Sequence, residues 1–205
     1  MSRQRVRPTR DETRQRIFTA AAGVFAELGV AGASIEQIAA AAGFTRGAFY
    51  SNFTSKDELA IAMLDDHLAR SQVRNRALVR EHPDAQGFVQ ALRDDHRPDD
   101  APLHHNPLLQ VELMLYVART PELRPLLGDH LRTMRSLVGE IATSILGASR
   151  PDIDVDPEAL GTVLVALEDG LRLHRLIDPD ATPADAFPDA LALIESLVLP
   201  RPTSA

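Results

Sequence analysis

Residues 34–53 concentrate polar side chains of the kinds that bond to bases and phosphates. Two short helices are predicted here, joined by a turn at Gly43, where the chain needs a left-handed residue. The second helix has an apolar side, formed by Ala48, Phe49 and Phe53. Its other side presents Thr45, Arg46, Gly47, Tyr50, Ser51 and Asn52. An arginine near the start of such a helix can bond both acceptors of guanine in the major groove, and hydroxyls suit phosphates.

Two residues outside this helix complete the candidate DNA-contacting set. Ser34 caps the first helix of the pair, and Lys56 stands in the first turn of the helix that follows. An ammonium group beside the free N–H groups of a helix N-terminus forms an anchor for a phosphate. Lys56 is the only lysine in the chain, so its placement is informative.

Charge is distributed unevenly along the 205 residues. Residues 1–56 contain eight basic and four acidic side chains, a net charge of +4, and because the whole chain has −7, the remaining residues carry −11. A basic head on an acidic body is expected when only the head meets nucleic acid. The arm with Arg3, Arg5 and Arg7 either reaches a minor groove or a phosphate, or stays a disordered tail with weak attraction.

Several functional classes are disfavoured by what the sequence lacks. It has no cysteine, and it has no motif of a hydrolase elbow, a zinc protease or a phosphate-binding loop. It also lacks the apolar run of a membrane span or a signal peptide, which predicts a cytoplasmic protein. The histidines and aspartates of residues 94–105 favour a solvated loop over a metal site, because Pro98 and Pro102 break the spacing of helical ligands. No metal, cofactor or catalytic activity is predicted.

Helix signals dominate the chain, and strand signals are scarce, so the sequence predicts an all-α protein. Capping boxes and cap–proline pairs mark helix starts at Thr9, Ser34, Ser55, Asn106, Thr120, Asp156 and Thr182. With two further starts, at Thr45 and near Asp84, helices are predicted over residues 10–28, 35–42, 46–52, 56 to the low eighties, 85–97, 107–119, 121–147, 157–177 and 183–199.

About residues 10–64 resemble the DNA-binding domain of the TetR family of bacterial regulators. The matching stretches are Thr13 to Phe25, Ile38-Ala39, Ala42 to Tyr50, and Phe53 to Leu59. Asn52 departs from the pattern, since the family often has His or Tyr there. The resemblance implies a helix-turn-helix domain over residues 1–56 and a ligand-binding and dimerisation domain over 57–205. It also implies a homodimer that binds double-stranded palindromic operator DNA, usually as a repressor, and releases it when a small-molecule effector binds.

Two apolar stripes near the end of the chain suit a four-helix dimer interface, with core packing within one chain as the alternative. The stripes consist of Leu160, Leu164, Leu167 and Leu171, then Phe187, Leu191, Ile194 and Val198. A second apolar set on the first of these helices, with Val163, Leu173 and Ile177, is assigned to the core.

Candidate ligand-binding residues lie on the body helices, although apolar stripes more often form core. They are Phe88, Leu92, Leu109, Leu113, Tyr116, Val117, Met134, Val138, Leu171 and His174. Low aromatic content argues against a large aromatic-lined cavity.

Three functions remain in competition. A ligand-responsive DNA-binding regulator leads, because the head resembles a long and ordered motif. An all-helical small-molecule-binding protein or enzyme without specific DNA binding is second, and a helical dimerisation adaptor is third. Specific binding of the DNA beside the protein's own gene separates the first from the others.

Overall fold

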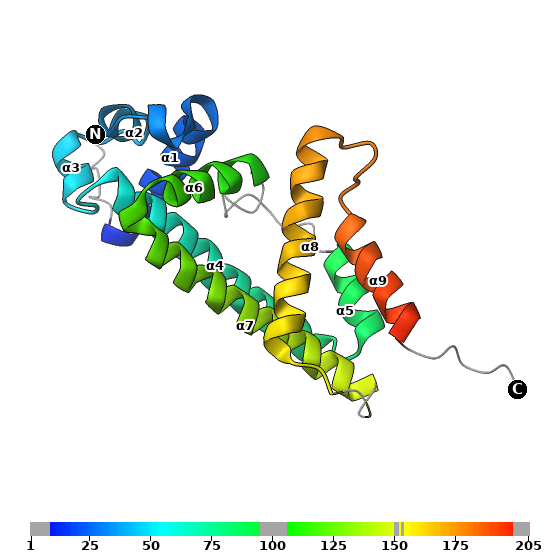
Figure 1. The fold of residues 1–205 in the computed structure, drawn as a ribbon. Helices are drawn as coiled ribbons and strands as arrows, with labels where there is room; N and C mark the ends of the chain where they lie inside the picture. The colour runs from blue at the N-terminus through cyan, green and yellow to red at the C-terminus, as the bar shows by residue number, and fades with distance from the viewer. Residues whose placement is uncertain (1–8, 95–105, 150–151, 153, 199–205) are drawn as a thin grey trace, which may run out of the picture. The chain divides into compact units, whose positions relative to one another are not determined.

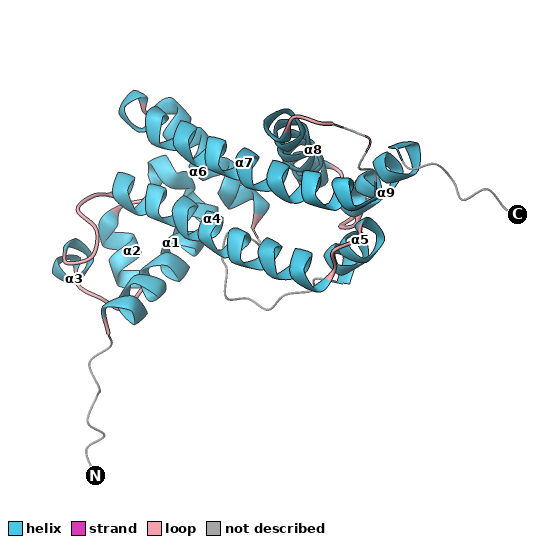
Figure 2. Cartoon of the chain, turned by 90° about the horizontal axis from the view of Figure 1, so that it is seen from below, coloured by secondary structure: helices cyan, strands magenta, loops and turns pink. Residues whose placement is uncertain are grey.

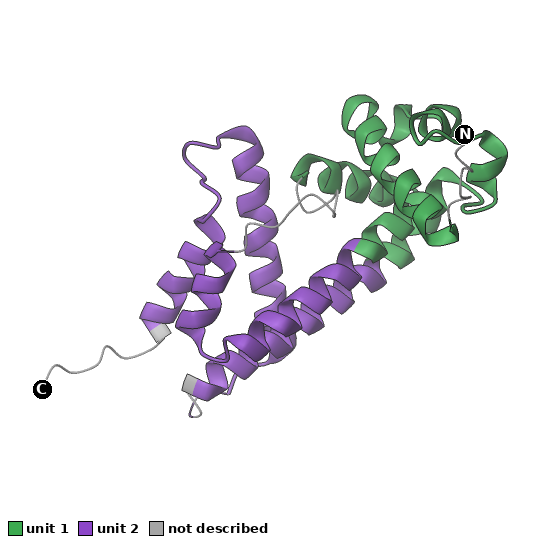
Figure 3. Cartoon of the chain, turned by 180° about the vertical axis from the view of Figure 1, so that it is seen from behind, with its two compact units in different colours: residues 1–66, 99–127 green, residues 67–98, 128–205 purple. Residues whose placement is uncertain are grey.

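The computed structural model describes residues 9–94, 106–149, 152 and 154–198, and these residues contain helices and loops but no strand (Figures 1 and 2). The chain divides into two compact units (Figure 3). Unit 1 consists of residues 1–66 and 99–127, and unit 2 of residues 67–98 and 128–205. The predicted all-α class is therefore confirmed. No helix of the described residues combines the length and apolarity that crossing a bilayer requires.

Unit 1 holds the first three helices, α1 (Arg10–Gly32), α2 (Ile35–Ala41) and α3 (Arg46–Tyr50), with the first turns of α4 (Lys56–Glu81) and all of α6 (Pro107–Arg119). Its core is apolar, with Phe25, Phe49 and Ile38 fully buried. Helix α6 contributes Leu109, Leu113 and Val117, spaced one turn apart and also fully buried, and packs against α1. This helix therefore closes the core that supports the short helices α2 and α3.

The first helix starts in unit 1 follow the predicted caps, whereas the predicted start at Thr120-Pro121 begins only a 3₁₀ turn without a side-chain cap, and the α-helix after it begins at Arg124. Thr9 and Glu12 form the capping box of α1, and Ser34 and Gln37 form that of α2. At Ser55 only half of the predicted box is present: the Ser55 hydroxyl accepts from the Glu58 N–H at 3.0 Å, but the Glu58 carboxylate accepts from Thr54. Each cap satisfies N–H groups that the first helical turn leaves without a partner.

Unit 2 contains most of α4, then α5 (Ala85–Asp94), most of α7 (Arg124–Ser149), α8 (Pro157–Ile177) and α9 (Ala186–Val198). A single 3₁₀ turn, η1 (Pro121–Leu123), precedes α7 and belongs to unit 1. Helix α9 packs against both α5 and α8 (Figure 1). An ion pair of 2.7 Å between Arg93 on α5 and Asp189 on α9 adds to this packing.

Two glycines bring α7 and α8 into backbone contact. A Cβ atom on Gly139 of α7 would lie 1.9 Å from the carbonyl oxygen of Pro157, and one on Gly161 of α8 would lie 2.0 Å from that of Arg135. No side chain of any other residue type fits such a crossing without moving a helix. The pair of glycines therefore sets both the distance between the helices and the rotation of α8 about its axis.

The last helix begins later than its cap–proline pair predicts. A start at Pro183 would place Pro188 inside the helix, where its missing N–H and its ring disrupt the ladder. The structure instead forms a turn, with the Ala186 N–H donating to the Pro183 carbonyl, and begins α9 at Ala186. Pro188 then falls in the first turn, where no N–H is needed.

Candidate nucleic-acid interface and pocket

The polar side of α3 is exposed, as expected for a surface that meets DNA. Tyr50 is 42% exposed, and the residues Thr45, Arg46, Gly47 and Ser51 are exposed beside it. Behind them the Phe49 ring is fully buried and lies 5.8 Å from the ring of Phe53. The buried rings hold the short helix in place, so its polar side is presented by a rigid support.

Arg46 is held by two neighbours on this surface. Its guanidinium forms an ion pair of 2.8 Å with Glu36 of α2, and it donates to the Tyr50 hydroxyl at 3.3 Å. The hydrogen bond to Tyr50, followed by the charge of Glu36, raises the pKa of Arg46 and keeps the group charged. Arg46 is thus oriented across the exposed surface, and Glu36 adds a negative charge to it.

Three hydroxyls of the predicted DNA-contacting residues form hydrogen bonds with the backbone of their own helices. Thr45 accepts from the Ala48 N–H at 3.2 Å, and Ser34 accepts from the Gln37 N–H at 3.2 Å. Ser51 donates to the Gly47 carbonyl at 2.9 Å. Since a hydroxyl oxygen keeps further bonding capacity, these contacts are compatible with an additional bond to phosphate.

Asn52 and Lys56, both predicted to contact DNA, bond to backbone carbonyls of the protein itself. The Asn52 amide donates to the Ala48 carbonyl at 2.9 Å, and its side-chain oxygen is buried. The Lys56 ammonium donates to the carbonyls of Ala31 and Ala33, at 3.1 and 2.9 Å. Burial lowers the pKa of Lys56, with Asp57 opposing the shift. Lys56 therefore stabilises the C-terminus of α1, where a cation is favoured.

Arg14 and Arg16, two further cations of α1, brace the pair of short helices. Arg14 donates to the Asn52 carbonyl at 3.0 Å and stacks 4.3 Å above the Phe53 ring. Arg16 donates to the Ala42 carbonyl at 3.1 Å, next to Gly43, which has a φ of 72°. The sequence indicates both only as members of a basic head, because no motif identifies an arginine whose partner is a backbone carbonyl.

Tyr116 connects α6 to the start of α4. Its hydroxyl donates to the Asp57 carboxylate at 2.5 Å, and its ring lies 5.5 Å from the Lys56 nitrogen. Burial, followed by the hydrogen bond and the charge of Asp57, raises the pKa of the Tyr116 phenol to about 12. The ring is therefore part of the support of unit 1, and its role in ligand binding stays a prediction.

A titration tests this hydrogen bond. The chain has two tyrosines, so in a Tyr50→Phe variant the phenolate absorbance reports Tyr116 alone. We expect a midpoint of about 12. Because the folded-state pKa lies above the ordinary value of 10.0, the stability that it adds is complete below that value and is lost as the pH rises through about 12. An added Asp57→Asn change should lower the midpoint, and a midpoint near 10 in the folded Tyr50→Phe protein would exclude the bond.

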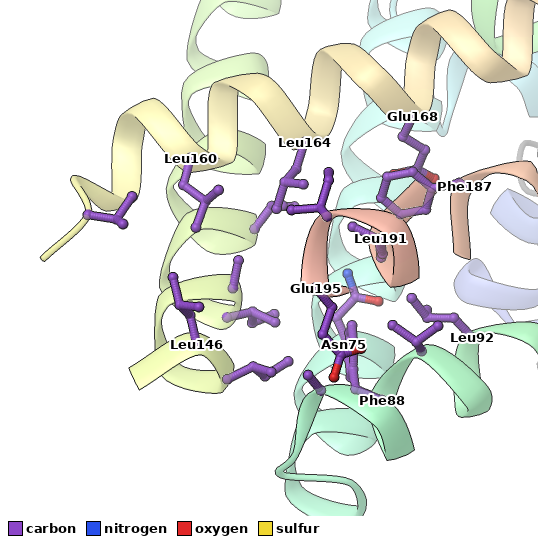
Figure 4. Close-up of a pocket in the computed structure, with 18 of the residues that line it drawn as sticks. Asn75, Phe88, Leu92, Leu146, Leu160, Leu164, Glu168, Phe187, Leu191 and Glu195 are labelled. Carbon is purple, nitrogen blue, oxygen red and sulfur yellow. The ribbon is translucent and has the colours of Figure 1, made fainter. Parts of the chain in front are cut away.

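Unit 2 contains a cavity of about 380 Å³ with a predominantly apolar lining. Helices α4, α5, α7, α8 and α9 all contribute side chains to it. In Figure 4, Leu160, Leu164 and Glu168 descend from successive turns of α8 on one side, and Phe88 and Leu92 rise from α5 on the other. Its size falls within the range of small-molecule sites, about 300–1,000 Å³.

The structure distributes the predicted ligand-binding residues over both units. Three of them line the cavity: Phe88, Leu92 and Val138. Leu109, Leu113 and Val117 instead fill the core of unit 1, because α6 packs on α1. Met134 and Leu171 are half-buried and His174 is exposed, and none of the three lines the cavity.

The two apolar stripes assigned to a dimer interface turn inward for the most part. Leu160, Leu164, Phe187, Leu191 and Ile194 line the cavity, while Leu167 and Leu171 are half-buried. The side chain of Val198 lies outside the described residues.

The second apolar side of α8, which the sequence assigns to the core, is exposed: Val163 is 59% exposed and Ile177 is 77% exposed. The reason is the contact of Gly161 with α7, which fixes the rotation of α8 and which periodicity alone cannot reveal.

Two family models match the chain. The model described as "Bacterial regulatory proteins, tetR family" matches residues 17–63, and the model described as "Tetracyclin repressor-like, C-terminal domain" matches residues 83–199. The first covers the exposed α3 surface, and the second covers all helices of the cavity except α4.

Curated relatives are bacterial regulators. TtgR of Pseudomonas putida, an HTH-type transcriptional regulator, is 43% identical over 74 residues, which are 33% of this chain and 35% of that protein. The chain thus spans about a third of the length of this relative. AcnR of Corynebacterium efficiens, an HTH-type transcriptional repressor, is 26% identical over 186 residues, which are 91% of this chain and 92% of that protein.

A solved structure extends the likeness along the chain. NalD of Pseudomonas aeruginosa, the secondary repressor of the MexAB-OprM multidrug efflux pump, has 25% identity and a TM-score of 0.64, covering 95% of this chain and 100% of that one. Together with the two family models, which include more than half of the chain, these matches lead to one conclusion. The chain belongs to the tetR family of bacterial regulatory proteins.

Proposed function

We propose that this protein is a cytoplasmic, ligand-responsive repressor that binds double-stranded operator DNA as a homodimer. The observation that carries the proposal is the exposed side of α3, where Arg46 and Tyr50 stand over a buried aromatic support. A helix presented in this way fits the major groove, with its N-terminal residues at base edges. AcnR and NalD are both described as repressors, which supports repression over activation.

Effector binding is assigned to the cavity of unit 2. It is the apolar space into which Phe88, Leu92 and Val138 project, and it lies within the segment matched by the C-terminal family model apart from its α4 residues. The body is not expected to catalyse a reaction: a cavity with few polar groups binds ligands but offers little acid–base chemistry.

A gel-shift titration tests the function. The probe is the DNA that flanks the protein's own gene, and the competitor is unrelated DNA of the same length. We expect a shift that survives the competitor and weakens steeply with salt, because phosphate contacts release counterions. Binding that the competitor abolishes, at low as well as moderate salt, would refute specific operator recognition and leave a helical small-molecule-binding protein as the better interpretation.

The dimer interface is assigned to the outer sides of α8 and α9. Leu193 is 60% exposed and Leu197 is 77% exposed on α9, and Val163 and Ile177 are similarly open on α8. Large exposed apolar side chains on two helices that pack together make these helices the candidate interaction site. Two copies of a helix pair joined in this way form a four-helix bundle, which is a common symmetric solution.

A charge placed on this surface tests the assignment. We expect Leu193→Glu to raise the dissociation constant of the homodimer about tenfold or more, which corresponds to about 1.4 kcal/mol. Sedimentation equilibrium measures the constant. Leu115→Glu is the matched control, since Leu115 is 44% exposed but belongs to α6 in unit 1. Equal dimer stability in both variants and the unchanged protein would contradict the proposed interface.

A further inference from the structure

The cavity of unit 2 is poor in groups that can bond to a polar ligand. Of the nineteen described residues that line it, four have polar side chains: Arg74, Asn75, Glu168 and Glu195. No serine, threonine, tyrosine or histidine is among them. Most of the wall therefore offers only van der Waals contact, and the ligand has to be recognised mainly by shape and apolar surface.

Some of these polar groups are already engaged in contacts within the protein. The Nε–H of Arg74 donates to the Asn75 side-chain oxygen at 3.1 Å. Glu168 forms an ion pair with Arg172, one turn further along α8. These contacts reduce the number of donors and acceptors that a ligand can use without breaking an existing bond.

The wall carries side chains of both charges. Among the described residues that line it, Arg74 is the one cation, and the two carboxylates are Glu168 and Glu195. Glu168 is paired with Arg172. A charged group buried in an apolar cavity is unfavourable unless an opposite charge compensates it. A charged ligand would meet a side chain of its own sign here as well as one of the opposite sign.

We propose that this cavity takes an uncharged, predominantly hydrocarbon molecule, and that carboxylates, phosphates and ammonium compounds of the same hydrocarbon size are rejected. The proposal rests on the proposed function in one respect only, that occupation of the cavity releases DNA. Binding itself is independent of DNA and can be measured without it.

Three probes with the same chain length separate the possibilities: 1-decanol, decanoate and decylammonium, each below its micelle concentration. Isothermal titration calorimetry with the full-length protein measures binding, and thermal unfolding gives a second readout. We expect decanol to bind at least about tenfold more tightly than either ion. Equal or tighter binding of decanoate would indicate that Arg74 binds the carboxylate of the ligand. Equal or tighter binding of decylammonium would indicate that Glu195 binds its ammonium group. Either result overturns the proposal.

Filling the cavity locates the binding site. Ala142 of α7 lines the cavity, whereas Ala148 of the same helix is exposed and does not. We expect Ala142→Phe to lose decanol binding and Ala148→Phe to keep it. Ala85→Phe, which enters the cavity from α5, serves as the second variant if Ala142→Phe unfolds. Undiminished decanol binding by the folded cavity variants would show that decanol binds elsewhere, which overturns the proposal.

A parallel gel shift distinguishes failure of the proposed cavity chemistry from failure of the proposed function. Loss of the operator complex with decanol, but not in the Ala142→Phe protein, supports both the cavity chemistry and the proposed function. Decanol binding that Ala142→Phe abolishes, without any effect on the operator complex, supports the cavity chemistry and refutes ligand-responsive release. If the protein binds its operator but none of the three probes, the DNA-binding part of the proposed function stands and the cavity chemistry is refuted.

Discussion

Replacing Gly161 by alanine should destabilise the protein by about 3 kcal/mol, which lowers Tm by roughly 6–12 °C for a chain of this size. The added Cβ would lie 2.0 Å from the Arg135 carbonyl oxygen, so α7 and α8 have to move apart. Gly139→Ala should have a similar effect, because its Cβ would lie 1.9 Å from the Pro157 carbonyl oxygen. Thermal and urea unfolding, followed by circular dichroism, measure both losses.

A third glycine provides the control for this expectation. Gly147 is also in α7, but a Cβ placed on it meets nothing within 4 Å. Alanine is the better helix former, so Gly147→Ala should stabilise the protein by about 0.5–1 kcal/mol. The three substitutions are chemically identical and differ only in what the new methyl group contacts. If all three variants showed the same change in the free energy of unfolding, α7 and α8 would not be in contact at Gly139 and Gly161.

Removal of Arg46 should have the largest effect on DNA binding. We expect Arg46→Ala to weaken the specific operator complex by about 1–3 kcal/mol, or roughly 5–150-fold, because a bidentate contact to guanine is lost. Competition gel shifts against unrelated DNA should show a smaller loss in the non-specific complex. Arg80→Ala, which removes an exposed arginine from unit 2, should leave both complexes unchanged.

Glu36 should act in the opposite direction. Its carboxylate pairs with Arg46 at 2.8 Å and lies on the surface that we propose meets the phosphates. Glu36→Gln keeps the shape of the side chain but removes the charge, so it should strengthen operator binding, by about two- to tenfold, and the gain should shrink as salt rises. A specific affinity that is unaffected by Arg46→Ala would remove Arg46 from the recognition surface, whatever the result for Glu36.

Much of the secondary structure is predictable from local chemistry. Asn106-Pro107 and Asp156-Pro157 predict the first residues of α6 and α8, since a cap and a proline act on their own first turn. Thr182-Pro183 fails to predict the start of α9 because a second proline, Pro188, tolerates only a place near the helix start. At Thr182-Pro183 the local signal is therefore overridden by a second proline in the same segment.

The placement of side chains across the fold is less predictable. Periodicity identifies two apolar sides of α8, but the contact of Gly161 with α7 decides which one turns inward. In the same way, the sequence predicts Lys56 as a phosphate anchor but does not reveal that it donates to the carbonyls of Ala31 and Ala33. The rotation of α8 and the partners of Lys56 both depend on residues that are distant in sequence. No sequence motif identifies either contact.

The contact between the glycines has a consequence for engineering this protein as a sensor. Val138 and Leu160 line the cavity and each is adjacent in sequence to one of the two glycines, so the backbone contact holds their Cα atoms at a fixed separation. A mutant library that varies these two positions together with Ala142 and Leu164 can reshape the interior one side chain at a time. Libraries that also vary Gly139 or Gly161 would change the spacing of the walls, and most of their members would be lost to misfolding before any ligand is tested.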